Sequence, residues 1–186
     1  MNNTYLEEWL EQAKRAPEKL EGIFTNLTEE ELNHKPSATC WSIGELVDHI
    51  MVTNSLYLPK YRKIIEGNHR NPFSSQFKYV TNFLGKSILH SVDPDNKKKL
   101  KTVKKFEPHN KQFNLDQMMQ FQKLNEELID LVVKTDHVNH QKTYIVSPAS
   151  PLIVYSLEYA NKIILWHGLR HIQQAGDVLN KSVEKV

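Results

Sequence analysis

The sequence predicts an all-α protein, a four-helix bundle with a long connection between its second and third helices. Four long segments carry apolar side chains at helical spacing, at about residues 4–25, 43–66, 115–134 and 157–180. Glycine is scarce, with 6 in 186 residues, and no internal repeat is present. Four long helices with one crossing connection are typical of such a bundle, and we expect a single domain over residues 1–186.

The first helix is predicted over residues 4–25, with Pro17 inside it. Proline removes a backbone donor and crowds the preceding turn, so we expect a kink or local break there. Thr28 and Glu31 follow at the spacing of a capping box, which predicts a short capped turn.

The second helix begins with the clearest local signal in the chain. Ser42 and Glu45 have capping-box spacing, and Trp41 stands just before the cap, where it can pack at the start of the helix. The helix is expected to continue to about Glu66, where Gly67 stops it. Its predicted core stripe is Ile43, Leu46, Val47, Ile50, Asn54, Tyr57, Tyr61 and Ile64.

The connection to the third helix is the least regular part of the sequence. Apolar residues recur at helical spacing near residues 76–90, which predicts a short helix. The run Lys97–Lys105 holds six lysines in nine residues. We expect a solvated loop and no nucleic-acid partner, because nucleic-acid sites favour arginines and interleaved aromatic residues.

The remaining two helices also have cap signals. Asn114 with Gln117 is expected to cap the third helix, at 115–134, and Ser156 the last one, at 157–180. A polar loop is expected between them.

The composition points to a cytoplasmic protein with no membrane partner. Lys and Arg number 24 against 22 Asp and Glu, so overall charge implies no partner. The single cysteine, Cys40, excludes an intrachain disulfide and is expected to pack in a loop. No segment resembles a signal peptide or reaches the roughly 18 consecutive apolar residues of a membrane span.

Three of the nine histidines stand out. His167 and His171 are four residues apart on the last helix, so both rings lie on one face, the face that also carries Ala160 and Ile164. Buried imidazoles need partners, and a metal ion would supply one. His49, early in the second helix, is the candidate third ligand. The others are expected to be solvated or unrelated to a metal: His34, His69, His90, His109, His137 and His140.

These residues resemble the DinB/YfiT-like superfamily over essentially the whole chain. The resemblance lies in Trp41-Ser42-x-x-Glu45-x-x-x-His49, in His167-x-x-x-His171-x-x-Gln174, in the segment Leu27–Pro36 and in Lys104-Lys105-Phe106-x-Pro108. It implies a bundle in up-down-down-up order, one divalent metal on His49, His167 and His171, and frequent homodimers. Residues 150–154 lack the glycine often found before the last helix of that family.

The resemblance also implies several activities. Some members are S-transferases or isomerases that use low-molecular-weight thiols such as bacillithiol or mycothiol, and others are called metal-dependent hydrolases. Three neutral imidazoles leave a zinc, nickel, iron or copper ion an open position at which a thiol or water is acidified. We favour zinc, nickel or iron. Our first hypothesis is a thiol S-transferase acting on small electrophiles; the alternatives are a hydrolase and a non-catalytic metal-binding bundle of a stress response.

Two further residues are candidates for catalysis. Glu45 lies one turn before His49, where it either completes the capping box or takes an acid/base role. Gln174, three residues after His171, can orient a ligand or substrate.

The last helix is apolar on more than its core face. Tyr159, Ile163, Trp166 and Leu169 lie around its other sides. Either this surface forms a homodimer, as we predict, or the long middle connection folds over it.

Overall fold

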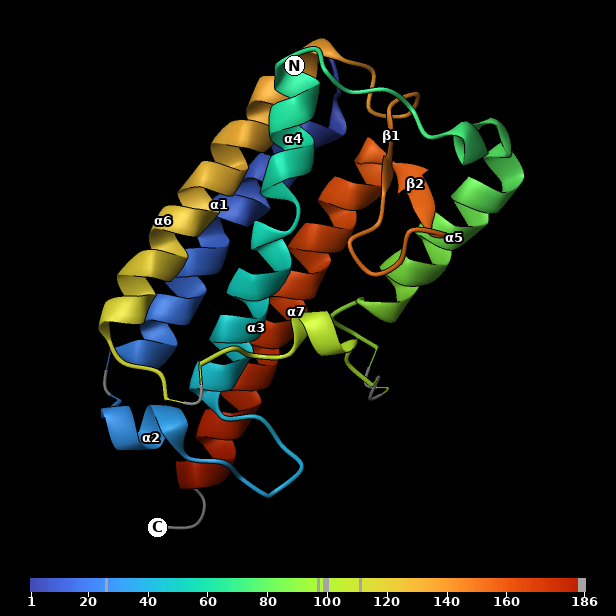
Figure 1. Ribbon diagram of the computed structural model, residues 1–186. Coiled ribbons are helices and arrows are strands. Elements are labelled where there is room, and N and C mark those ends of the chain that lie inside the picture. Colours follow the sequence, from blue (N-terminus) through green and yellow to red (C-terminus); the bar gives the residue numbers. More distant parts are fainter. Residues whose placement is uncertain (26, 97, 99–100, 111, 184–186) are drawn as a thin grey trace.

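A computed structural model describes residues 1–25, 27–96, 98, 101–110 and 112–183. Its long helices are α1 (Tyr5–Phe24), α3 (Ile43–Ser55) continued by α4 (Leu58–Ile65), α6 (Asp116–Lys134) and α7 (Leu157–Val183). In Figure 1, α1 and α7 run one way and α3–α4 and α6 the other. The predicted four-helix bundle and its up-down-down-up order are therefore confirmed.

Helix α1 runs through Pro17 without a break, contrary to the break we considered. Proline cannot donate to the carbonyl four residues earlier, which here belongs to Ala13. Asn125 of α6 donates its Nδ2 to that carbonyl oxygen at 3.4 Å, so a neighbouring helix satisfies it instead.

The predicted second helix is two helices, which corrects the expectation of one continuous element. Helix α3 ends at Ser55 and α4 begins at Leu58, with Pro59 in its first turn. Pro59 has no N–H for the carbonyl of Ser55, and its ring disfavours a helix through that point. The predicted core stripe still holds across the break, since all of its residues are buried.

Capping signals located the helix starts well. Ser42 Oγ accepts from the Glu45 amide at 3.1 Å, and Glu45 Oε2 accepts from the Ser42 amide at 2.9 Å. Asn114 and Gln117 form the same reciprocal pair, at 2.8 and 3.2 Å. Thr28 caps the short helix α2 (Glu29–Asn33) in the same way.

The middle connection contains more structure than the sequence suggested. After the 3₁₀ helix η1 (Phe73–Gln76) comes α5 (Lys78–Ser91), close to the predicted 76–90, and later the 3₁₀ helix η2 (Lys104–Phe106). The lysines at 98, 101, 104 and 105 are exposed, as expected of a solvated loop, whereas Lys97 and Lys99 lie outside the described residues.

The loop before α7 was expected to lack regular structure, but it contains an antiparallel hairpin. After the 3₁₀ helix η3 (Thr135–His137), strands β1 (Tyr144–Val146) and β2 (Val154–Ser156) pair, with Ile145 opposite Tyr155. Ser156 Oγ then accepts from the Tyr159 amide at 3.3 Å, as the predicted cap of α7 requires.

Helix α5, which belongs to the middle connection, and the hairpin cover the outer side of α7 (Figure 1). Of the two possibilities for this apolar surface, the structure therefore shows the one in which the middle connection folds over α7. A Cβ added to Gly85 of α5 would lie 2.7 Å from the ring of Tyr159, so the two helices approach closely. Ile163 is buried, and Tyr159, Trp166 and Leu169 are partly buried against the core.

The core lies between α1, α3–α4, α6 and α7 and has two connected parts. One surrounds Trp9, Tyr61 and Tyr155, and the other surrounds Leu20, Val47 and Phe121. Among the described helices, none is long and apolar enough to cross a membrane.

Candidate metal centre

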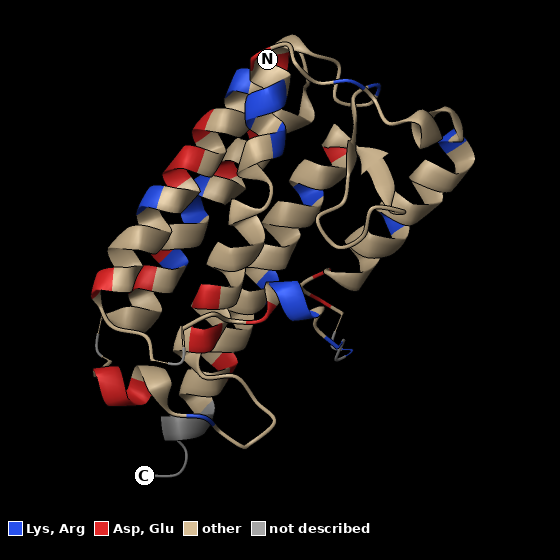
Figure 2. Ribbon diagram, viewed as in Figure 1, with Lys and Arg blue, Asp and Glu red and all other residues tan. Residues whose placement is uncertain are grey.

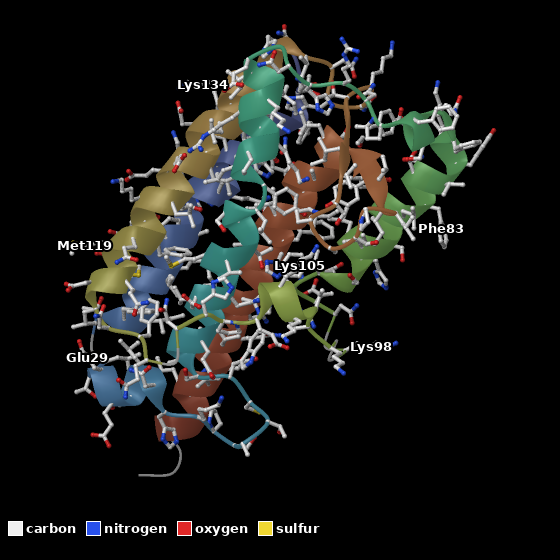
Figure 3. All side chains as sticks on the ribbon, viewed as in Figure 1. Glu29, Phe83, Lys98, Lys105, Met119 and Lys134 are labelled. Carbon is white, nitrogen blue, oxygen red and sulfur yellow. The ribbon has the colours of Figure 1, made fainter. Side chains whose placement is uncertain are left out.

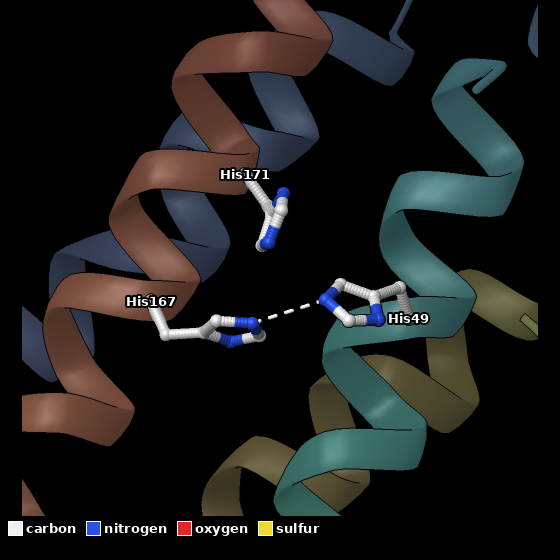
Figure 4. Close-up of side chains that lie close together, drawn as sticks. All are labelled: His49, His167 and His171. Carbon is white, nitrogen blue, oxygen red and sulfur yellow. Dashed lines mark hydrogen bonds between the residues drawn. The ribbon is translucent and has the colours of Figure 1, made fainter. Parts of the chain in front are cut away.

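Three histidine rings from two helices converge between α3 and α7 (Figure 4). His49 comes from α3, and His167 and His171 come from successive turns of α7. One nitrogen of each ring lies within 4.8 Å of the other two, and the ring centroids are 4.5 to 4.9 Å apart. The structure thus brings together the three residues that the sequence proposed as ligands.

The ring of His49 is held by a backbone carbonyl. Its Nδ1 lies 2.5 Å from the carbonyl oxygen of Phe106, in η2. A carbonyl can only accept, so Nδ1 carries the proton and Nε2 of the neutral ring keeps its lone pair. Partners of this kind fix the tautomer and orientation of metal-binding histidines.

Gln174 does the same for His171. Its Oε1 accepts from Nδ1 of His171 at 2.7 Å, one turn along α7. This contact leaves Nε2 of His171 available to a ligand. A positioning contact was expected of Gln174, whereas its part in catalysis stays a prediction.

His167 is the unsatisfied member of the group. Its Nε2 lies 3.0 Å from Nε2 of His49, while its buried Nδ1 has no hydrogen-bond partner among the described residues. The close pair of Nε2 atoms requires a proton on one of them. A cation between the rings would replace that contact, so the donor set fits a divalent ion held by imidazoles.

The surroundings of all three rings favour their neutral form. Burial lowers the pKa of His49, while the Phe106 carbonyl and Asp48 oppose that effect. Burial, then the neighbouring His49, lowers the pKa of His171 to about 3. Burial, then His171 and His49, holds the pKa of His167 well below its usual value. Metal binding needs neutral imidazoles, so the site is poised for it.

Trp41 forms one wall of the centre. Its ring centroid is 4.8 Å from that of His49 and 6.3 Å from that of His171. The capping box places this side chain, because it fixes how the chain enters α3. Glu45 completes that box and also pairs with Lys35 at 2.8 Å, so both carboxylate oxygens have partners. Its acid/base role stays a prediction.

Two residues that the sequence analysis did not select hold the surrounding loops. Asp48 is 3% exposed and accepts from the amides of His109 at 2.5 Å and Asn110 at 3.1 Å. These bonds anchor the segment that carries Phe106. Arg170, between the two histidines of α7, donates to the carbonyls of Asp93, Asn96 and Lys98.

The other histidines lie away from this group. His34, His90, His109 and His137 are exposed, as expected, while His69 is half-buried. His140 lies in the loop after α6, as expected, but is fully buried there, which the sequence did not predict. Its Nδ1 bonds Tyr5 Oη at 2.6 Å and its Nε2 lies 3.0 Å from Thr135 Oγ1, so protein groups satisfy both nitrogens.

Comparison with known families now identifies the chain. A family model described as the DinB superfamily matches residues 12–175, which include all three histidines. The chain belongs to the DinB superfamily. The segment Lys104–Pro108 has a structural role, since the carbonyl of Phe106 within it holds His49.

A solved structure supports the same fold. YfiT from Bacillus subtilis, described as a probable metal-dependent hydrolase with an unusual four-helix bundle topology, superposes with a TM-score of 0.59. The match covers 96% of this chain and 87% of that one at 12% identity, so it shows the DinB fold and not the reaction. No curated protein matches the sequence.

Proposed function

We propose that this protein is a metal-dependent enzyme with His49, His167 and His171 as the ligands of one divalent ion. The observation that carries the proposal is the convergence of three neutral imidazoles, two of which are held in the ligating tautomer by Phe106 and Gln174. When bound, such an ion supplies a Lewis-acidic position that acidifies a thiol or a water molecule.

We infer further that the nucleophile is a low-molecular-weight thiol and the reaction its transfer to a small electrophile. Among the described residues, no cysteine or acidic residue joins the three-histidine group. The carboxylates of Glu45 and Asp48 already accept hydrogen bonds from other protein groups, which weakens either as a base for water. A thiol is far more acidic than water and depends less on such a base.

A hydrolase that activates water is the second candidate, because YfiT is described as a probable metal-dependent hydrolase. Both reactions would use the same three imidazoles and the same wall formed by Trp41. They differ in what turnover requires: a transferase stops without thiol, and a hydrolase does not.

The test begins with metal analysis of the purified protein, and then compares turnover with and without thiol. A halonitrobenzene would be offered with bacillithiol, mycothiol, glutathione or cysteine, using His171→Ala as the inactive control. Thiol-dependent product that is lost in the variant supports the transferase. Absence of such product from metal-loaded protein would overturn it, and ester hydrolysis without thiol would support the second candidate.

We also propose a homodimer, with α5 rather than α7 as its surface. Phe77, Tyr79 and Phe83 are 55%, 94% and 71% exposed, and Phe73 beside them is 82% exposed. Figure 3 shows Phe83 projecting from the outer side of α5. Val80 on the same helix is 55% exposed, so this segment offers the large apolar side chains that interfaces between subunits bury.

Sedimentation of the wild type and Phe83→Glu tests the dimer. We expect a wild-type dimer at tens of micromolar and a monomeric variant, because a charge in an apolar interface loses its hydration. Met119→Glu, at a 62% exposed residue of α6, is the matched control and should remain dimeric. A monomeric wild type would exclude the dimer.

A further inference from the structure

A second concave site lies at the end of α4, outside the three-histidine group. It is a pocket of about 260 Å³ between α4, residues 68–72 and β1. Lys60, Lys63, His69 and Arg70 line it together with the apolar side chains of Ile145 and Val146. Drug-sized sites are usually ~300–1,000 Å³, so this pocket suits a smaller molecule.

The charge in this pocket is uncompensated. No acidic residue lines it, and Lys60, Lys63 and Arg70 form no ion pair in the part of the chain that the structure describes. Burial lowers the pKa of the half-buried Lys60, and repulsion from Lys63 and Lys105 adds to this effect. Figure 2 shows the basic residues of α4 and η2 on the same face of the bundle.

One polar atom of a residue that borders the pocket lacks a partner. His69 Nε2 is buried, and no described group hydrogen-bonds to it. Buried polar atoms are nearly always hydrogen-bonded, so a ring nitrogen that the described protein groups leave unsatisfied is unusual here. The donors that line the pocket are the side chains of Lys60, Lys63 and Arg70.

The pocket wall is held in place without a ligand. Asn71 donates its Nδ2 to the carbonyl of Lys142 at 2.9 Å, and its Oδ1 accepts from the Tyr144 amide at 2.8 Å. These bonds fasten the segment that carries His69 and Arg70 to the start of β1. A preformed wall lowers the ordering cost of binding.

We propose that this pocket binds the carboxylate or phosphate group of a small anionic molecule. Lys60, Lys63 and Arg70 contact the anion through charge-assisted hydrogen bonds, and Ile145 and Val146 contact its apolar part. The site does not depend on metal binding at the histidines, because it shares no residue with that group.

The test is an amide NMR titration of the full chain with inorganic phosphate and, separately, with malonate, at constant ionic strength set with sodium chloride. We expect saturable shifts at residues 68–71 and 145–146. Loss of one charged hydrogen bond in Lys60→Gln or Arg70→Gln should raise Kd by about tenfold. Lys86→Gln, an exposed lysine of α5, is the control and should stay within twofold.

Several results would overturn the proposed anion binding in this pocket. These are shifts centred on His49, the same Kd in the pocket variants and the control, or the same shifts with chloride alone. If Lys60→Gln does not fold, Arg70→Gln in the exposed loop tests the same point. His171→Ala should retain anion binding, which separates this site from the proposed metal centre. The tighter of the two probes identifies the preferred group.

Discussion

Replacing Asp48 with alanine should weaken metal binding although, among the described residues, its hydrogen bonds go to His109 and Asn110 and not to the three rings. Its carboxylate accepts from the amides of His109 and Asn110, and from Asn110 Nδ2 at 2.6 Å. These bonds fasten the segment just after Phe106, whose carbonyl orients His49. Without them, the segment loses its anchor on α3 and the His49 ring loses its fixed tautomer.

The size of the effect follows from two opposing terms. Hydrogen bonds to a charged acceptor contribute about 1.5–3 kcal/mol each, but removing a buried carboxylate also removes its desolvation cost. His109 and Asn110 are exposed, so water can replace part of what they lose. We expect a net loss of about 2 kcal/mol in the free energy of unfolding, or roughly 4–8 °C in Tm. Metal affinity should fall about tenfold, which is the lower end of the effect expected when a group that supports a metal ligand through hydrogen bonds is lost.

Urea unfolding of the metal-free protein and titration with zinc or nickel measure the two effects. Asp130→Ala is the control, because Asp130 forms only an exposed pair with Lys134 at 2.7 Å, worth about 0.5 kcal/mol. Asp48→Asn keeps one acceptor and should lie between wild type and Asp48→Ala. Equal stability loss in Asp48→Ala and the control, or an unchanged metal Kd, would refute the reasoning.

Three other predictions concern the candidate metal centre and the packing of the helices around it. Removing metal with a chelator should cost about 2.7 kcal/mol at a hundredfold excess of metal over its Kd, and scanning calorimetry should show no such effect in His171→Ala. The metal-free protein should lose stability as pH falls from about 6.5 towards 3, because His171 binds a proton in the unfolded state over this range but stays neutral in the folded state, where its pKa is about 3. Urea midpoints should therefore change less with pH in His171→Ala than in the wild type. An equal slope in the two proteins would contradict this. Gly85→Ala should destabilise the protein by about 2 kcal/mol, because the added Cβ overlaps the ring of Tyr159. Gly22→Ala should stabilise it by about 0.5 kcal/mol, because the added Cβ has no atom within 4 Å. Urea unfolding that ranked the two variants the other way would refute the packing argument.

Features set by local sequence were predictable. The capping pairs at Ser42 and Asn114 marked helix starts, because each signal lies within three residues. The spacing of His167 and His171 placed both rings on one side of α7. One local signal was overlooked: Pro59 marks the break between α3 and α4.

Features set by distant contacts were not predictable. The partner of His49 is the Phe106 carbonyl, and a backbone atom has no residue-specific signature. The burial of His140 within its loop was not predicted, because its partner Tyr5 lies 135 positions away. The strands of the hairpin have three residues each, too few for an alternating pattern to be recognised. The sequence also left open what covers α7, since an apolar face does not identify its partner.

The separation of the three proposed ligands along the chain has a consequence for how the protein matures. His49 and His167 are 118 positions apart. At translation rates of about 5–20 residues per second, His49 leaves the ribosome roughly 6–24 s before His167. Only in the last part of that interval, once Lys134 has emerged, can α3 associate with α6, and until His167 emerges only one of the three proposed ligands is present. Bringing the three imidazoles together requires closing this long loop, which the contacts of α7 with α1 and α3 favour, so we expect metal uptake to follow the folding of the bundle.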